Sequence, residues 1–202
     1  MVAPVINLSG SEVVDGVRVA DSIASELNAF DSVTVIPVNL TLAAMATAGL
    51  ARIESPVQAR ALATEFGADA TIVTAVTEFD PYDPMVLSMT MQWYSVKPDA
   101  APGYEPFAQT ATRMMRDTRD AEFAPTVQVQ RVFQASDKVV LDEMEEYGER
   151  RDGDESAYGW RKYAQSQELY VRYCSWSLIR SMLRVREYGT DAVDPEEADY
   201  GS

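Results

Sequence analysis

The sequence places a tyrosine and a lysine, Tyr158 and Lys162, four positions apart. On a helix this spacing brings the two side chains one turn apart on the same face, where the lysine ammonium would lower the pKa of the phenol. A tyrosine activated in this way suits acid–base chemistry on a dinucleotide cofactor. Such a cofactor needs a glycine-rich loop after the first strand, and residues 7–16 contain only two separated glycines. We therefore predict an ordinary amphipathic helix face and no cofactor.

Four carboxylates lie close together at Asp142, Glu143, Glu145 and Glu146. We expect them on a strand, residues 139–147, where Glu143 and Glu145 share a face and raise each other's pKa. A glycosidase would need a further carboxylate on the opposite side of its substrate, and nothing in the sequence fixes such a pair. The favoured interpretation is that the strand leaves the core here and that its acids face water.

The segment Asp152-Gly153-Asp154-Glu155-Ser156 resembles the opening of a calcium-binding loop. An EF-hand loop requires glycine at its sixth position and glutamate at its twelfth. Those two positions hold Ala157 and Tyr163 in this chain. The sequence therefore favours a solvated, charged turn that caps the following helix over a metal site.

Two absences limit the available chemistry: the chain has no histidine and a single cysteine, Cys174. Histidine is the usual general base and the commonest metal ligand, and a cysteine nucleophile needs a neighbour that lowers its pKa. Cys174 falls among apolar residues in the middle of an expected helix, so we predict a buried structural thiol. A serine nucleophile would lack both its glycine-flanked turn and an activating histidine. We assign no catalytic residue, no cofactor-binding residue and no metal ligand.

The most distinctive short segment is the turn formed by Asp80, Pro81, Tyr82, Asp83 and Pro84. Its two prolines restrict the backbone, and Tyr82 offers the large amphipathic surface that protein interfaces favour. The alternative is a rigid hairpin turn with no partner. We take these five residues as the candidate interaction loop.

The charge of the chain restricts its partners, because 32 acidic and 17 basic side chains give a net charge of −15 over 202 residues. An acidic surface repels phosphate groups, so we expect neither nucleic-acid binding nor docking on anionic lipids. No apolar run is long enough to span a bilayer, and we expect no direct membrane insertion of this domain. Met1 is followed at once by an apolar strand, which indicates a trimmed chain from which a targeting segment was removed.

The hydrophobic pattern predicts alternating strands and helices, then two hairpins and a long helix. The expected strands are 2–6, 33–37, 70–79, 85–95, 126–135 and 139–147, and the expected helices are 15–28, 40–48, 55–66 and 156–187. This order predicts an α/β (α+β) fold, with a mixed sheet of about five to six strands, helices packed on it and a long C-terminal helix. We expect one domain over residues 1–187, with an irregular excursion at 96–124, and an acidic disordered tail at 188–202.

One stretch of the chain resembles a known group of proteins. The segment Phe66-Gly67-Ala68-Asp69-Ala70, the strand at 72–79 and the turn at 80–84 are similar to the helix, Gly-Ala-Asp, strand and turn of bacterial cell-envelope proteins. These include the curli-secretion lipoprotein CsgG, the N-terminal domain of TolB and the lipoprotein activators of penicillin-binding proteins. The pattern covers residues 2–145, while the 96–124 excursion and the tyrosine-rich C-terminal helix depart from it.

The resemblance implies an α/β domain shaped like anticodon-binding domains, exported and often lipid-anchored through an upstream segment. Such proteins act as scaffolds, secretion parts or activators, and they share no catalytic residues. The resemblance therefore places the chain in the periplasm or at the outer membrane, if an export signal was removed from its start.

Three functional hypotheses follow. The favoured one is a non-catalytic protein-interaction or scaffold domain of an envelope-associated protein, whose partner is another envelope protein or a second copy of the chain. The alternative is a cytoplasmic small-ligand-binding or regulatory module. The least favoured is a carboxylate-using or Tyr/Lys enzyme, which would need a deep pocket at Glu143, Glu145, Asp152 or Tyr158. A second copy is considered because the last helix has an aromatic edge that must be buried within the domain or across a homodimer. The edge consists of Tyr163, Tyr170, Tyr173 and Trp176.

Overall fold

The computed structural model describes residues 1–31, 33–97, 125–152 and 158–188 of the chain. These residues form one mixed sheet of four strands in the order β1-β2-β3-β4. The strands are β1 (Ile6–Asn7), β2 (Ala70–Asp80), β3 (Val86–Ser95) and β4 (Val127–Gln134). β1 runs parallel to β2, and the other neighbours are antiparallel. The fold is α/β as expected, but the prediction of five to six strands is wrong for the described residues.

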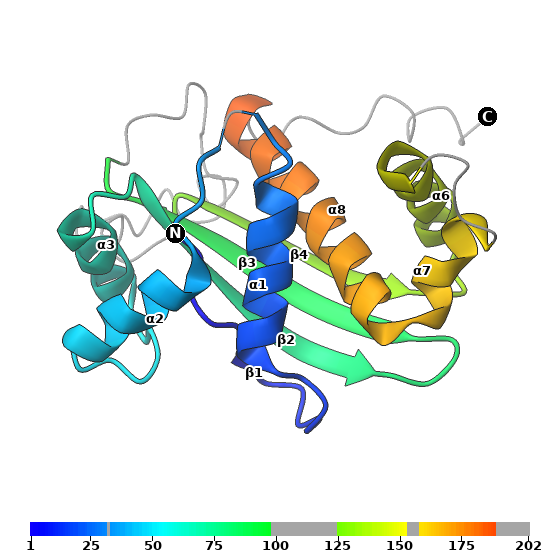
Figure 1. Cartoon of the computed structure of the whole chain (residues 1–202), viewed down its shortest axis with the longest axis horizontal. Coiled ribbons are helices and arrows are strands. Elements are labelled where there is room, and N and C mark those ends of the chain that lie inside the picture. Colours follow the sequence, from blue (N-terminus) through cyan, green and yellow to red (C-terminus); the bar gives the residue numbers. More distant parts are fainter. Residues whose placement is uncertain (32, 98–124, 153–157, 189–202) are drawn as a thin grey trace, which may run out of the picture.

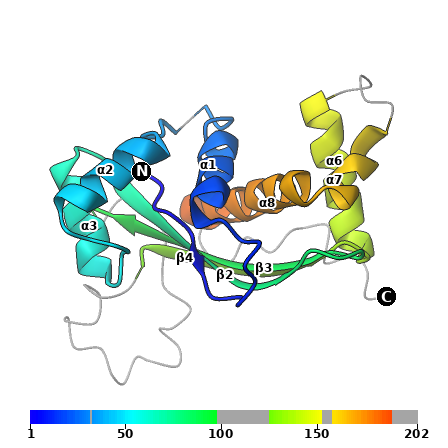
Figure 2. The same ribbon diagram turned by 60° about the horizontal axis from the view of Figure 1, so that its bottom comes forward.

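Six α-helices in the described ranges accompany the sheet. They are α1 (Gly16–Leu27), α2 (Val38–Thr47), α3 (Pro56–Glu65), α6 (Lys138–Asp152), α7 (Lys162–Gln165) and α8 (Gln167–Tyr188), with a 3-10 turn, η3 (Gly159–Arg161), before α7. Figure 1 shows α2 and α3 at one end of the molecule and α6 and α7 at the other, with α1 and α8 between them. Figure 2 shows that α1 and α8 lie on the same side of the sheet.

Two segments predicted as strands are not strands. Residues 33–37 pair with no strand, and Val33 and Val35 instead pack against the edge of the main core. Pro37 has no N–H to donate to a ladder, and β-branched residues favour any half-buried surface, so their presence alone does not establish a strand.

Residues 139–147 form most of helix α6. The carboxylate of Asp137 accepts a hydrogen bond from the backbone N–H of Val139 at 2.9 Å, which satisfies an otherwise free donor at the helix start. The buried residues Val140, Met144 and Tyr147 then recur at helical spacing. The prediction of a strand over residues 139–147 is therefore wrong, because it missed this helical spacing.

The predicted helix 156–187 is interrupted at Ser166, whose backbone is extended (φ −113°, ψ 121°). Helix α8 begins directly after it. The Ser166 carbonyl accepts from the N–H of Tyr170 at 2.8 Å, so the residue that ends α7 also starts α8.

The main hydrophobic core lies between the sheet and helices α1 and α8. Ile23 and Leu27 of α1 pack with Met89 and Met91 of β3, and all four are buried. The aromatic edge of the last helix belongs to the same core, because Tyr163, Tyr170, Tyr173 and Trp176 are buried within the chain. Of the two alternatives for this edge, the structure shows burial within the domain.

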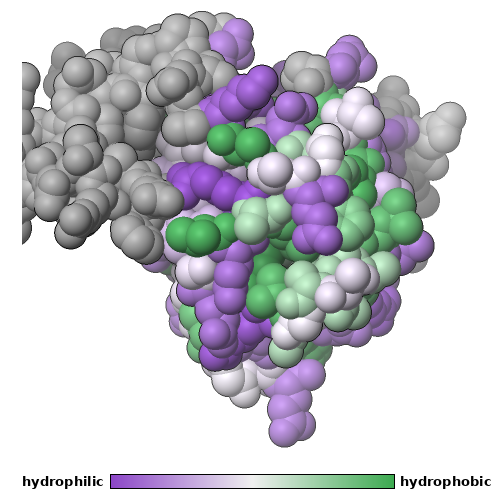
Figure 3. All heavy atoms as spheres, turned by 90° about the vertical axis from the view of Figure 1, so that its left-hand side faces the viewer, coloured by the Kyte–Doolittle hydropathy of each residue, from purple (hydrophilic) through white to green (hydrophobic). Residues whose placement is uncertain are grey.

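A smaller core lies on the opposite side of the sheet, because side chains alternate along a strand. Val73 and Tyr94 pack there with Leu62 of α3. At the end of the molecule that carries α2 and α3, Leu40 and Val57 are exposed. Figure 3 shows apolar side chains gathered over these two helices.

None of the helices in the described ranges is long and apolar enough to cross a membrane. Residues 98–124, most of the predicted excursion, and residues 189–202, most of the predicted tail, lie outside the described residues. The excursion and the disordered tail therefore stay predictions.

Candidate functional site

A cleft of about 800 Å³ opens between the N-terminal halves of α1 and α8, above the end of β2. Its floor is apolar and is made by Val76 and Phe79 of β2, Leu87 of β3 and Val171 of α8. Its walls are polar and carry Asp15, Arg18 and Asp21 on one side and Gln167, Glu168 and Arg172 on the other. The cleft thus joins an apolar base to a charged rim, an arrangement that suits an amphipathic ligand.

The start of α1 forms one wall of the cleft. Asp15 caps this helix, because its carboxylate accepts hydrogen bonds from the N–H groups of Val17 at 2.9 Å and Arg18 at 3.2 Å. Gly16 follows, and its carbonyl accepts from the N–H of Val5 at 2.9 Å. A Cβ at residue 16 would collide with the Val5 carbonyl oxygen, so only glycine lets the N-terminal segment pass this close to the helix.

The start of α8 forms the other wall. Arg18 of α1 reaches across to Glu168 of α8, with a distance of 3.6 Å between Nη2 and Oε2. Their side chains are 75% and 69% exposed, so this ion pair contributes little to stability. It spans the cleft without closing it.

None of the five residues of the predicted interaction loop lines this cleft, but the loop lies at its lip, because it follows Phe79 of the floor and its Pro81 is bonded to Gln167 of the wall. The carboxylate of Asp80 accepts from the N–H of Tyr82 at 3.1 Å, and the Pro81 carbonyl accepts from Gln167 of α8 at 3.5 Å. After the turn, the Met85 carbonyl accepts from the Tyr170 hydroxyl at 3.2 Å. The turn is therefore joined to α8 on both sides, while the Tyr82 side chain is 79% exposed.

A buried carboxylate, Glu26, stands behind the cleft near the end of α1. It is inaccessible to solvent and accepts from Arg151 of α6 at 2.8 Å and from Arg172 of α8 at 3.2 Å. Burial, followed by the negative charge of Glu26, raises the pKa of the nearby Tyr147 well above its usual value, and Arg151 partly opposes this. The cluster ties three helices together and fixes one cleft residue, Arg172.

Glu26 was not among the residues predicted from the sequence. It sits seven positions after the buried Val19, on the apolar stripe of α1, and a charged residue at such a position is the signal that could have found it. Its partners lie 125 and 146 residues away, so no local pattern predicts them.

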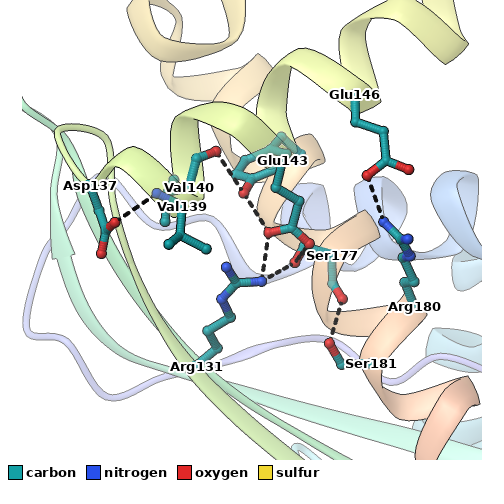
Figure 4. A network of polar contacts seen from close by, with 10 residues as sticks. Arg131, Asp137, Val139, Val140, Glu143, Glu146, Ser177, Arg180 and Ser181 are labelled. Atoms are coloured by element: carbon teal, nitrogen blue, oxygen red, sulfur yellow. Dashed lines mark hydrogen bonds and ion pairs between the residues drawn. The ribbon is translucent and has the colours of Figure 1, made fainter. Parts of the chain in front are cut away.

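The carboxylates considered for catalysis lie on α6, and Glu143 binds within the fold (Figure 4). Glu143 accepts from Arg131 of β4 at 2.6 Å, from Ser177 at 2.8 Å and from the Tyr173 hydroxyl at 2.9 Å. These contacts occupy both of its oxygens. Glu145 is exposed on the same helix and does not share this environment, contrary to the expectation of a strand face.

The neighbouring Glu146 has a similar structural role. It bridges Arg150 at 2.6 Å and Arg180 of α8 at 3.0 Å. With Glu143, it fastens α6 to α8 along the side shown in Figure 4.

The tyrosine–lysine pair of the sequence is not brought together for catalysis. Tyr158 is 74% exposed, and the Lys162 ammonium lies 2.7 Å from Asp152. Asp152 also accepts from the Tyr163 hydroxyl at 2.5 Å. Burial alone would raise the pKa of Asp152, but the hydrogen bonds from Lys162 and Tyr163, with the charges of Lys162 and Arg151, lower it overall. The other residues of the calcium-like segment, 153–156, lie outside the described residues.

Cys174 is fully buried in the main core, as predicted. Burial raises the pKa of its thiol well above the usual value, partly opposed by the charge of Arg131. A thiol held in this state is a poor nucleophile.

No protein-family model and no curated protein matches this sequence. Among solved structures, the PelC dodecamer from Paraburkholderia phytofirmans is 14% identical, with 92% of this chain and 85% of that chain covered and a TM-score of 0.40. The hypothetical protein CT253 from Chlamydia trachomatis is 12% identical, with 92% and 95% covered and a TM-score of 0.46. Likenesses of this strength establish neither fold nor function. The resemblance to CsgG and TolB stays a prediction.

Proposed function

We propose that the chain is a non-catalytic protein-interaction domain that binds a segment of a partner protein in the α1–α8 cleft and against the turn 80–84. The observation that carries this proposal is the position of Tyr82. A large aromatic side chain, 79% exposed, stands on a turn fixed by hydrogen bonds at the lip of a cleft with an apolar floor.

Tyrosine suits a contact surface because it loses little conformational freedom when it binds. Tyrosine buries a large area for the loss of few torsional degrees of freedom, which is why it is common among residues that dominate binding energy. The hydrogen bonds from the Tyr82 N–H to Asp80 and from Gln167 to the Pro81 carbonyl hold the turn in place before binding, so little further conformational freedom is lost when a partner binds. A docking surface of this kind favours recognition of another protein.

The reactive side chains of the sequence support the non-catalytic part of the proposal. Glu143 and Asp152 are engaged in ion pairs within the fold, and the Cys174 thiol is buried. Neither the α1–α8 cleft nor a smaller groove between α1 and α2 is lined by any of the three.

The volume of the cleft favours a second candidate, a small-ligand-binding module. About 800 Å³ falls within the range of roughly 300–1,000 Å³ that small-molecule sites occupy. A metabolite-sized compound that raises the melting temperature in a library screen, and loses this effect when Phe79→Ser widens the floor, would favour this alternative.

The cell envelope is the location that we propose, on the sequence resemblance alone. The intact mass of the native protein, isolated from membrane and soluble fractions of its own cells, tests it. A lipidated N-terminus in the membrane fraction supports the proposal, and an unmodified chain in the cytosol overturns it.

Site-specific photo-cross-linking tests the interaction itself. A photoreactive phenylalanine analogue is placed at Tyr82, and at Tyr158 as a matched control, because both tyrosines are highly exposed and only Tyr82 lies on the turn that follows the cleft residue Phe79. We expect a discrete adduct from position 82 and none of that mass from position 158. An adduct of twice the chain mass would identify a second copy as the partner, and equal adducts from both positions would contradict the proposal.

A further inference from the structure

We propose that the partner segment is cationic and amphipathic, with lysine or arginine side chains beside an apolar anchor. This inference rests on the proposed function and names the chemistry that the cleft selects. It follows from the charge of the rim, from the behaviour of Arg18 and from the apolar floor.

The rim of the cleft has an excess of acidic groups. Asp15, Asp21 and Glu168 line it, and the turn at its lip adds Asp80 and Asp83. Two arginines also line the cleft, Arg18 and Arg172, and the single negative charge of Glu26 behind Arg172 is shared between Arg172 and Arg151. Three carboxylates and two arginines therefore line the cleft, two further carboxylates lie on the turn beside it, and the whole chain has a net charge of −15. A field of this sign attracts a basic segment and repels an acidic one.

Arg18 shows how a cation is accommodated in this rim. Its guanidinium lies 3.6 Å from Glu168 across the opening, in an exposed and weak pair. A lysine or arginine of the partner can take the place of Arg18 at Glu168 at little cost, because Arg18 then turns into solvent. Arg18 thus occupies the position at Glu168 that a cationic side chain of the partner would take, and it competes with that side chain for Glu168.

The floor supplies the second requirement. Phe79 and Val171 are partly exposed and offer apolar surface to a side chain that enters between the two helices, whereas Val76 is buried beneath them. Burial of such a side chain supplies binding free energy that charge alone does not, whereas rim charges act mainly on the association rate and on specificity. A purely cationic segment is therefore a weaker ligand than one that also carries an apolar anchor.

Three fluorescein-labelled twelve-residue peptides test the inference by fluorescence anisotropy against the full chain. One alternates leucine and lysine, one alternates leucine and glutamate, and one alternates serine and lysine. We expect the leucine–lysine peptide to bind most tightly, the serine–lysine peptide more weakly and the leucine–glutamate peptide least. Raising the salt concentration from about 50 to about 300 mM should weaken binding of the leucine–lysine peptide about tenfold or more, because salt screens contacts between exposed charges.

Two variants of equal net charge separate the cleft from the general acidity of the surface. Asp21→Asn with Glu168→Gln changes the rim, and Glu65→Gln with Glu145→Gln changes exposed positions on α3 and α6. The rim variant should weaken binding of the leucine–lysine peptide about fivefold or more and the distant variant less than about twofold. Arg18→Gln, which removes the competitor, should strengthen binding.

The outcomes distinguish this inference from the proposed function. If the two variants weaken binding equally, or if the leucine–glutamate peptide binds as tightly as the leucine–lysine peptide, the proposed charge preference is wrong. If an uncharged or acidic peptide binds and Tyr82→Ala abolishes its binding, the cleft is an interaction site and only the charge inference fails. If no peptide's binding depends on Tyr82 or on the rim, the proposed function fails with it.

Discussion

Removing the charge of Glu26 is the sharpest test of the internal architecture that positions the cleft. Glu26 is buried and accepts from two arginines on two other helices, Arg151 of α6 and Arg172 of α8. Glu26→Gln keeps the size of the side chain but leaves the two guanidinium groups facing each other without a counter-ion. We expect the free energy of unfolding to fall.

The magnitude follows from the exposure of the arginines. Breaking a fully buried ion pair by removing one partner costs about 3–5 kcal/mol. The side chains of Arg151 and Arg172 are 31% and 27% exposed, so water solvates them in part after the substitution. Discounted for this solvation, the expected loss is about 2–3 kcal/mol.

Urea unfolding at pH 7, followed by far-ultraviolet circular dichroism, measures this loss. Arg18→Met is the matched control, because it removes an exposed arginine–glutamate pair and should change the unfolding free energy by less than about 0.5 kcal/mol. Combining Glu26→Gln with Arg172→Met should show a coupling energy of about 1 kcal/mol or more, since the two side chains are in contact. If Glu26→Gln costs no more than the control, Glu26 is not the buried link between α1, α6 and α8, and the reasoning is refuted.

Three further predictions concern other parts of the fold. Asp152→Asn should destabilise the protein at pH 7, and this difference from the wild type should shrink as the pH falls below about 4. The reason is that a carboxyl whose pKa is lowered on folding contributes stability that is lost when it is protonated. Urea midpoints measured across this pH range test the prediction, and a constant difference would count against the Asp152–Lys162 contact. The Cys174 thiol should resist iodoacetamide at pH 8 in the folded protein and react after unfolding, as mass spectrometry reads out, whereas rapid labelling of the folded state would disprove its burial. Gly16→Ala should cost about 1–3 kcal/mol in the same urea assay, because the added Cβ meets the Val5 carbonyl, and a neutral effect would show that this approach is looser than described.

Local signals in the sequence predicted several elements well. The helix predicted from Ser55 and Pro56 is α3, in which Ser55 is the N-cap and Pro56 the first helical residue. The alternation of residues 85–95 predicted β3, whose residues Leu87 and Met89 are indeed buried. Caps and short periods involve neighbours in the chain, which is why they can be read from it.

The secondary-structure predictions were wrong where long-range packing decides whether a segment becomes a strand or a helix. Residues 139–147 begin with the β-branched Val139 and Val140, yet the burial of Met144 and Tyr147 in the main core, with Tyr147 against α7 and α8, selects a helix. Tertiary contacts of this kind override propensity, and they are not visible in a short window.

In the candidate site, too, one part could be predicted from local sequence and the other depends on long-range packing. The turn around Tyr82 could be selected from its prolines and its aromatic residue alone. The cleft beside it depends on α1 and α8, whose starts at Gly16 and Gln167 are about 150 residues apart in the chain. The rim charge and the apolar floor therefore became evident only once the fold brought these elements together.

The most direct test of the central claim is the affinity of the cross-linked partner for two variants of the full chain, Tyr82→Ala and Tyr158→Ala. Both remove an exposed tyrosine, but only Tyr82 lies on the turn that follows the cleft residue Phe79. If the chain binds its partner through this cleft, Tyr82→Ala should weaken binding about tenfold or more, as the loss of a central aromatic contact does, and Tyr158→Ala should leave it unchanged. Equal affinities for the two variants would contradict the claim.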